Sequence, residues 1–159
     1  MRFTTNHDET AWNSPAITLW NGPQGARAAF VATAMMPGVP LLYNGQEIES
    51  AQKLPLFERD PVKWNQPNAA GARRFYRHVI ELAKQFANAP MAVVSNSAAN
   101  DVISYRRGDA LVVVNARPRA VIVTVDGVSA AGMRDLLSGI RQKGSSVALA
   151  GYGVVVLTR

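Results

Sequence analysis

Hydrophobic positions follow helical spacing in two segments of the chain. In residues 72–86, apolar side chains recur every three or four positions with charged residues between them, which predicts a long amphipathic helix. Residues 24–36 are rich in alanine and show the same spacing. A second helix is expected there, because Pro37 and Gly38 follow directly and stop it.

Two short runs in the first half predict strands. Residues 2–6 are β-prone, and residues 39–43 form a nearly all-apolar run between glycines, as is typical of a strand buried on both faces of a parallel sheet. The polar segments 7–25 and 48–67, which contain proline and glycine, predict loops. The predicted order is strand, loop, helix, strand, loop, helix, which is the alternation of βα units with a parallel sheet.

After Asn88 the pattern changes to short runs rich in β-branched residues, separated by turn signals. These runs predict four antiparallel strands, at residues 101–107, 110–116, 120–125 and 153–158. The predicted fold class is therefore α/β plus all-β. We expect one domain in residues 1–88 and a small antiparallel β-domain in residues 89–159.

The amino-acid composition excludes several kinds of site and argues against two classes of partner. The chain has no cysteine, which excludes disulfides, thiolate zinc sites and a cysteine nucleophile. The net charge of +6 comes mainly from the part after residue 88, where arginines stand without aromatic residues between them, so no nucleic-acid partner is expected. No run of membrane-spanning length and no signal-peptide pattern is visible, so no membrane partner is expected. The cellular compartment stays open.

The first candidate chemistry lies near the N-terminus. A β-prone start runs into Asn6, His7, Asp8 and Glu9, which places a carboxylate beside an imidazole just past a predicted strand. Taken alone, this pattern also fits a polar strand end without a ligand. Metal-dependent hydrolysis by His7, Asp8 and Glu9 is disfavoured, because metal sites need three or four converging ligands and the other histidine lies on the long helix.

Three stretches, in the right order, resemble motifs of the α-amylase family, glycoside hydrolase family 13. The motif at the end of that family's seventh barrel strand is matched by FTTNHDE, the eighth-strand motif by PGVPLLYNGQE, and an arginine segment of its glucosidase-like members by RDPVKWN. The tail, with DLLSG and GYGVVVL, is similar to the family's C-terminal domain. The resemblance implies a partial TIM (β/α)8 barrel, its last two βα units, followed by a small antiparallel β-sandwich domain.

The resemblance also implies roles for four residues. Asp8 would be a catalytic carboxylate that stabilises the transition state by binding two sugar hydroxyls, and His7 would be a neighbouring hydrogen-bond donor. Arg59 would bind the sugar next to the cleaved bond, although its segment departs from the family form at three positions and a loop salt bridge is the alternative. Trp12 would stack on a glucose ring or pack within its loop.

Other residues of these motifs are expected to be structural. Glu47 ends the eighth-strand motif, where the family's glutamate supports the segment and does not catalyse. Tyr43 and Trp64 are expected to pack. We expect His78, on the polar side of the long helix, at the surface.

The family's nucleophile and acid/base carboxylates have no counterpart here, and neither does its calcium loop, so no cofactor is expected in this chain. The resemblance thus implies a fragment of an α-amylase-like retaining glycosidase that acts on α-glucans such as starch or maltodextrin. We expect this fragment to be inactive alone and to require a missing upstream barrel half or self-association. The alternative is a non-catalytic carbohydrate-binding or structural fragment.

Overall fold

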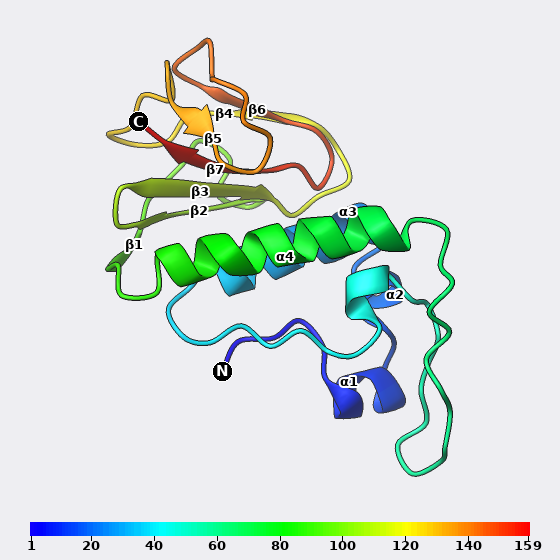
Figure 1. Cartoon of the computed structure of the whole chain (residues 1–159). Coiled ribbons are helices and arrows are strands. Elements are labelled where there is room, and N and C mark those ends of the chain that lie inside the picture. The colour runs from blue at the N-terminus through cyan, green and yellow to red at the C-terminus, as the bar shows by residue number, and fades with distance from the viewer.

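Three layers make up most of the molecule: a pair of long helices, a five-stranded antiparallel sheet and a two-stranded sheet (Figure 1). The computed structural model describes residues 1–159. A region of coil and short helices extends from the long helices on the side away from the sheets, and the N-terminus lies in this region (Figure 1).

The helical layer consists of α3 (Pro23–Ala34) and α4 (Ala69–Gln85), which confirms both predicted helices. Proline suits the first turn of α3, because the N–H that it lacks would have no partner there. The two helices pack through their apolar faces, and the rings of Phe30 and Tyr76 meet edge to face with their centroids 4.9 Å apart.

The loop predicted at residues 7–25 is wrong in part, because it contains α1 (His7–Trp12) and α2 (Ala16–Leu19). Asn6 caps α1 by accepting a hydrogen bond from the backbone N–H of Glu9 at 2.9 Å. Carboxylates in the first turn also favour a helix start, since the N-terminal end of the helix dipole is positive. Helix start signals therefore outweigh the polar composition of this segment.

The strands predicted at residues 2–6 and 39–43 are reduced to one parallel bridge, between Arg2 and Pro40. The backbone of Arg2 donates to the residue before Pro40 at 2.8 Å and accepts from the residue after it at 2.7 Å. Pro40 has no N–H to extend the pairing, and an isolated pair of strands is marginal in water. The parallel direction agrees with the prediction, but these segments do not form the predicted barrel strands.

The predicted strands after Asn88 are confirmed as β2 (Val102–Arg107), β3 (Ala110–Asn115), β4 (Val121–Val123) and β7 (Val154–Thr158). Three further strands were not expected: β1 (Met91–Val93), β5 (Arg134–Asp135) and β6 (Val147–Leu149). The larger sheet has the order β1-β2-β3-β7-β5 with antiparallel neighbours throughout, while β4 pairs with β6.

Strand β3 lies at the centre of the larger sheet, and all of its residues are buried. Its alternating side chains serve two cores: Val112 and Val114 pack with α3 and α4, whereas Leu111 and Val113 pack with β4 and β6. The β-rich part thus has two layers of strands, which agrees in part with the predicted β-sandwich. The helices cover the other face of the larger sheet (Figure 1).

A buried arginine joins the helices to this sheet. Arg107 in β2 is 2% exposed, and its guanidinium donates to the carbonyls of Met35 and Ala87, both at 3.0 Å, and of Ala89. These carbonyls lie at the C-terminal ends of α3 and α4 or just beyond them, where the helix dipole is negative. The core and its polar contacts therefore cross the predicted domain boundary after residue 88.

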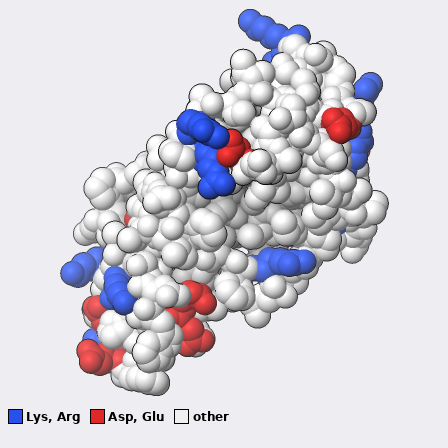
Figure 2. Space-filling model, turned by 180° about the vertical axis from the view of Figure 1, so that it is seen from behind, with Lys and Arg blue, Asp and Glu red and all other residues white.

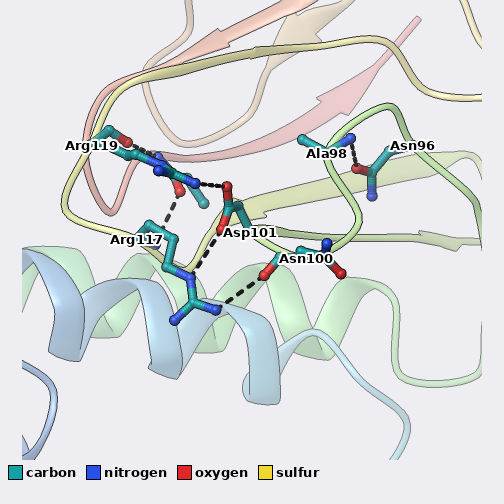
Figure 3. A network of polar contacts seen from close by, with 7 residues as sticks. Asn96, Ala98, Asn100, Asp101, Arg117 and Arg119 are labelled. Carbon is teal, nitrogen blue, oxygen red and sulfur yellow. Dashed lines mark hydrogen bonds and ion pairs between the residues drawn. The ribbon is translucent and has the colours of Figure 1, made fainter.

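A second polar network fastens two turns on the outside of the β-rich part (Figure 3). The carboxylate of Asp101 accepts hydrogen bonds from Arg119 at 2.5 Å and Arg117 at 3.1 Å, and Arg117 also donates to the carbonyl of Asn100 at 3.1 Å. The hydrogen bonds from Arg119 and Arg117 hold the pKa of Asp101 below its usual value. The turn before β2 is thereby tied to the segment after β3.

Candidate functional site

His7 and Asp8 lie in the first turn of α1 and face solvent. The imidazole Nε2 of His7 is 3.4 Å from Oδ1 of Asp8, and the two side chains are 65% and 55% exposed. An exposed pair at this distance is weak, and neither group is committed to a partner inside the fold. Both polar groups are therefore accessible to a molecule from outside.

A buried hydrogen bond joins the segment around His7 and Asp8 to the segment of the second motif. The side chain of Gln46 donates to the hydroxyl of Thr4 at 2.8 Å, and the hydroxyls of Thr5 and Thr10 lie 3.0 Å apart. Thr4 and Gln46 are 42 positions apart in sequence, so this contact brings the two motifs together. The indole N–H of Trp20 donates to the carbonyl of Thr4 at 3.4 Å and ties the residue after α2 to the first motif.

Glu47 braces its own turn. Its carboxylate accepts a hydrogen bond from the amide of Gly45 at 2.8 Å, and Gly45 has a left-handed backbone with φ of 92°. A residue with a side chain would be strained at Gly45. The contact is of the structural kind that we expected for Glu47.

A nearly buried ion pair lies behind this turn. The guanidinium of Arg27 in α3 contacts the carboxylate of Glu49 at 2.6 Å. The hydroxyl of Tyr76 in α4 is buried nearby without a hydrogen-bond partner. Its burial and, after that, the negative charge of Glu49 raise the pKa of Tyr76 far above the usual tyrosine value, so the phenol stays neutral.

Arg59 lies on a long loop that runs alongside α1 (Figure 1). Its side chain is exposed and makes no hydrogen bond or ion pair within the chain, so the alternative of a loop salt bridge has no partner here. The loop residues before it, 55–58, line a hollow of about 270 Å³ together with Ala11 and Trp12 of α1. Trp12 and the segment carrying Arg59 thus share one surface.

Three polar residues and one aromatic residue predicted for the site therefore lie at the same end of the molecule. His7, Asp8 and Trp12 come from α1, and the loop of Arg59 adjoins Trp12. The sequence did not single out Phe57, which is 91% exposed at this hollow. Its signal is an aromatic residue among the charged residues and prolines of the loop.

His78 is not the surface residue that we expected. Its ring is half-buried, and its Nε2 lies 2.7 Å from the carbonyl oxygen of Leu136 in the β-rich part. The contact helps to fix α4 on the sheet. Because the partner lies 58 positions away, no local pattern predicts it.

No group of three or more His, Asp or Glu side chains is arranged to hold a metal ion. No helix is long and apolar enough to cross a membrane.

No family model matches the sequence, and no curated protein matches it closely. Solved structures match nearly the whole chain. A noncanonic maltogenic α-amylase from Thermotoga neapolitana aligns with 99% of the chain at a TM-score of 0.77 and 21% identity, and a protein of Thermus thermophilus aligns with 98% at 0.73 and 24%. A trehalose-6-phosphate hydrolase from Bacillus licheniformis aligns with 99% at 0.71 and 15%.

The aligned region is a minor part of those proteins. It makes up 40%, 35% and 43% of the three structures, so the chain spans about two fifths of their length. At these identities the comparison concerns the fold.

Proposed function

We propose that this chain is a fragment of an α-glucan-acting retaining glycosidase. Our premise is that it has the fold of the C-terminal part of α-amylase-type enzymes. In the proposed enzyme, Asp8 is the carboxylate that stabilises the transition state. One observation carries the proposal. The buried bond between Thr4 and Gln46 unites the two motifs, and Asp8 stands exposed four residues beyond Thr4.

The chemistry proposed for this end follows from the charge that develops during the reaction. Retaining glycosidases pass through an oxocarbenium-like transition state, and hydrogen bonds from the sugar hydroxyls strengthen as that state forms. Asp8 would accept such bonds, His7 would donate to a neighbouring hydroxyl, and Arg59 would offer fixed paired donors. Interactions that are stronger in the transition state than in the ground state raise the rate.

The nucleophile and the acid/base carboxylate of such an enzyme must come from another chain segment, because residues 1–159 hold no counterpart of either. We propose that residues 1–88 form the last two βα units of a barrel and that residues 89–159 form its C-terminal β-domain. Support comes from the paired segments at Arg2 and Pro40, whose apolar neighbours Phe3 and Val39 are exposed. Unpaired strand edges with exposed apolar side chains favour association, with an upstream barrel half or with a second copy.

The test is the release of reducing sugar from maltodextrin. We expect no turnover by the purified chain alone, and turnover when it is mixed with the separately expressed remainder of the Thermotoga neapolitana enzyme. Turnover by the chain alone would contradict the proposed absence of nucleophile and acid. An inactive mixture whose two parts co-sediment would contradict the proposed fragment.

A non-catalytic carbohydrate-binding role is the second candidate, and the 71% exposure of Trp12 favours it. Saturable maltooligosaccharide binding that depends on Trp12, together with an inactive mixture, would select this role. Absence of binding would leave only a structural role.

A further inference from the structure

A left-handed glutamate ends the turn that carries Gln46. The turn is the short 3-10 helix η1 (Gln46–Ile48), and Glu49, which follows it, has a φ of 56°. This conformation is costly for a residue with a side chain, and glycine or asparagine normally occupies it. Gly45, at the start of the turn, follows that rule. A glutamate persists in this conformation only because contacts around it outweigh the strain, and such residues cluster at functional sites.

The contacts that hold Glu49 are made by its carboxylate. Its Oε1 lies 2.6 Å from Nε of Arg27 in α3, and the side chain of Glu49 is only 6% exposed. The guanidinium of Arg27 also lies over the ring of Phe75 in α4, 5.2 Å from the ring centroid. Figure 2 shows many charged side chains on the surface of one face of the molecule, where solvent screens them. The nearly buried pair is screened much less, so it fastens the turn to the long helices.

Hydrogen bonds continue from this turn to α1. The side chain of Gln46 donates to the hydroxyl of Thr4, and both residues are buried. Next along the chain, the hydroxyl of Thr5 lies 3.0 Å from that of Thr10, which is buried within α1. Asp8 lies in the same helix. A continuous set of contacts therefore leads from the ion pair to the helix that carries Asp8.

We propose that Arg27 and Glu49 form a positioning pair for Asp8, because they hold the turn of Gln46 and, through it, the first motif and α1. The proposal rests on the proposed function, since it concerns how the carboxylate of that reaction is placed. Neither member of the pair touches the substrate; both act through the turn. A catalytic group that is misplaced by about 1 Å can lose about 100-fold in rate, so this placement affects kcat.

Hydrogen exchange in the purified, isotope-labelled chain, followed by NMR, tests the positioning without any activity. Glu49→Gly removes the carboxylate and supplies a residue suited to the left-handed backbone, so new strain is not the cause of any loss. We expect two exchange rates to rise by at least about fivefold: that of the indole N–H of Trp20, which is bonded to Thr4, and that of the amide of Thr10 in α1. The amides of β3 should change by less than about twofold, because the sheet does not depend on this pair.

Variants of Arg27 test whether the effect belongs to the pair. Arg27→Ala should give the same pattern as Glu49→Gly, and the double variant should add nothing to it, because the two side chains share one contact. Arg27→Lys keeps a cation opposite Glu49 and should restore most of the protection.

The matched control is Arg119→Ala, which removes one member of an ion pair of similar length, 2.5 Å from Asp101, on the outside of the β-rich part. It should leave the exchange of the Trp20 indole and the Thr10 amide unchanged. Exchange at Thr10 that is not faster in Glu49→Gly, or that rises no more than exchange in β3, would overturn the positioning role.

In the mixture with the remainder of the Thermotoga neapolitana enzyme, Glu49→Gly should lower kcat by about tenfold and change KM by less than about twofold. A purely structural role would not divide the loss in this way. An unchanged kcat in an active mixture would overturn the proposal while the proposed function stands. An inactive parent mixture whose parts co-sediment would contradict the proposed function, and the exchange experiment would still decide whether the pair positions α1.

Discussion

The sheet and the α1 end of this molecule differ in where their side chains find partners. In the sheet, every residue of β3 is buried, and the guanidinium of Arg107 is satisfied by carbonyls of the same chain. At the α1 end, Trp12 and Phe57 are open to solvent, and Arg59 makes no contact with a carboxylate. The first region is held by contacts within the chain, and the second leaves aromatic and charged side chains exposed to solvent.

Among the stability predictions, Arg107→Leu should have the largest effect, because it removes a buried contact between the helices and the sheet. It leaves the buried carbonyls of Met35, Ala87 and Ala89 without their donor, so we expect the free energy of unfolding to fall by about 3 kcal/mol. Urea unfolding followed by circular dichroism measures the loss.

Arg106→Leu is the control, since Arg106 stands next in the same strand and is exposed. Its free energy of unfolding should change by less than about 0.5 kcal/mol. Equal losses in the two variants would contradict the role assigned to the buried guanidinium.

Tyr105→Phe tests the same junction with a smaller change. The hydroxyl of Tyr105 donates to the carbonyl of Ala32 in α3 at 2.8 Å, and its removal should cost about 1 kcal/mol. The same urea experiment on Tyr152→Phe provides the comparison, because the hydroxyl of Tyr152 meets Asn21 at an exposed position. A Tyr105→Phe variant as stable as the parent would show that this bond contributes nothing.

The sequence predicted the long helices and the longer strands well, and the short elements and long-range contacts poorly. The helix at Ala69–Gln85 and the three longer strands, β2, β3 and β7, follow from patterns within one segment. Strands β5 and β6 have two and three residues, too few to form a pattern. The predicted resemblance to the α-amylase family is confirmed at the level of the fold, while the predicted barrel strands were reduced to a single bridge.

In the candidate site, too, contacts between distant parts of the sequence were not predicted. Helix α1 was missed, because the polar composition of residues 7–25 predicted a loop, although Asn6 followed three positions later by Glu9 is a helix start signal. The contact of Thr4 with Gln46 and the burial of Arg107 were not predicted either, since their partners are 42 and 72 positions away. A charged residue in a strand is normally exposed, so only the packed helices explain why this one is buried.

The smallest change in stability is expected when acid weakens the polar network around Asp101 (Figure 3). The pKa of Asp101 is lowered in the folded chain by Arg119 and Arg117, so its stabilising contribution is present above the ordinary aspartate pKa of about 4 and is lost as the pH falls through the lowered value. Asp101→Asn should therefore be slightly less stable than the parent at neutral pH and equally stable in strong acid. Thermal unfolding at several pH values measures the difference, and a constant gap at every pH would contradict it.

The most direct test of the central claim is the effect of Asp8→Asn on maltodextrin hydrolysis by the chain mixed with the remainder of the Thermotoga neapolitana enzyme. Because Asp8 is exposed, the free energy of unfolding of the chain should change by less than about 0.5 kcal/mol. We predict that kcat of the mixture falls by at least about 100-fold, as expected when a transition-state contact is lost. An unchanged kcat in the folded variant would contradict the role assigned to Asp8.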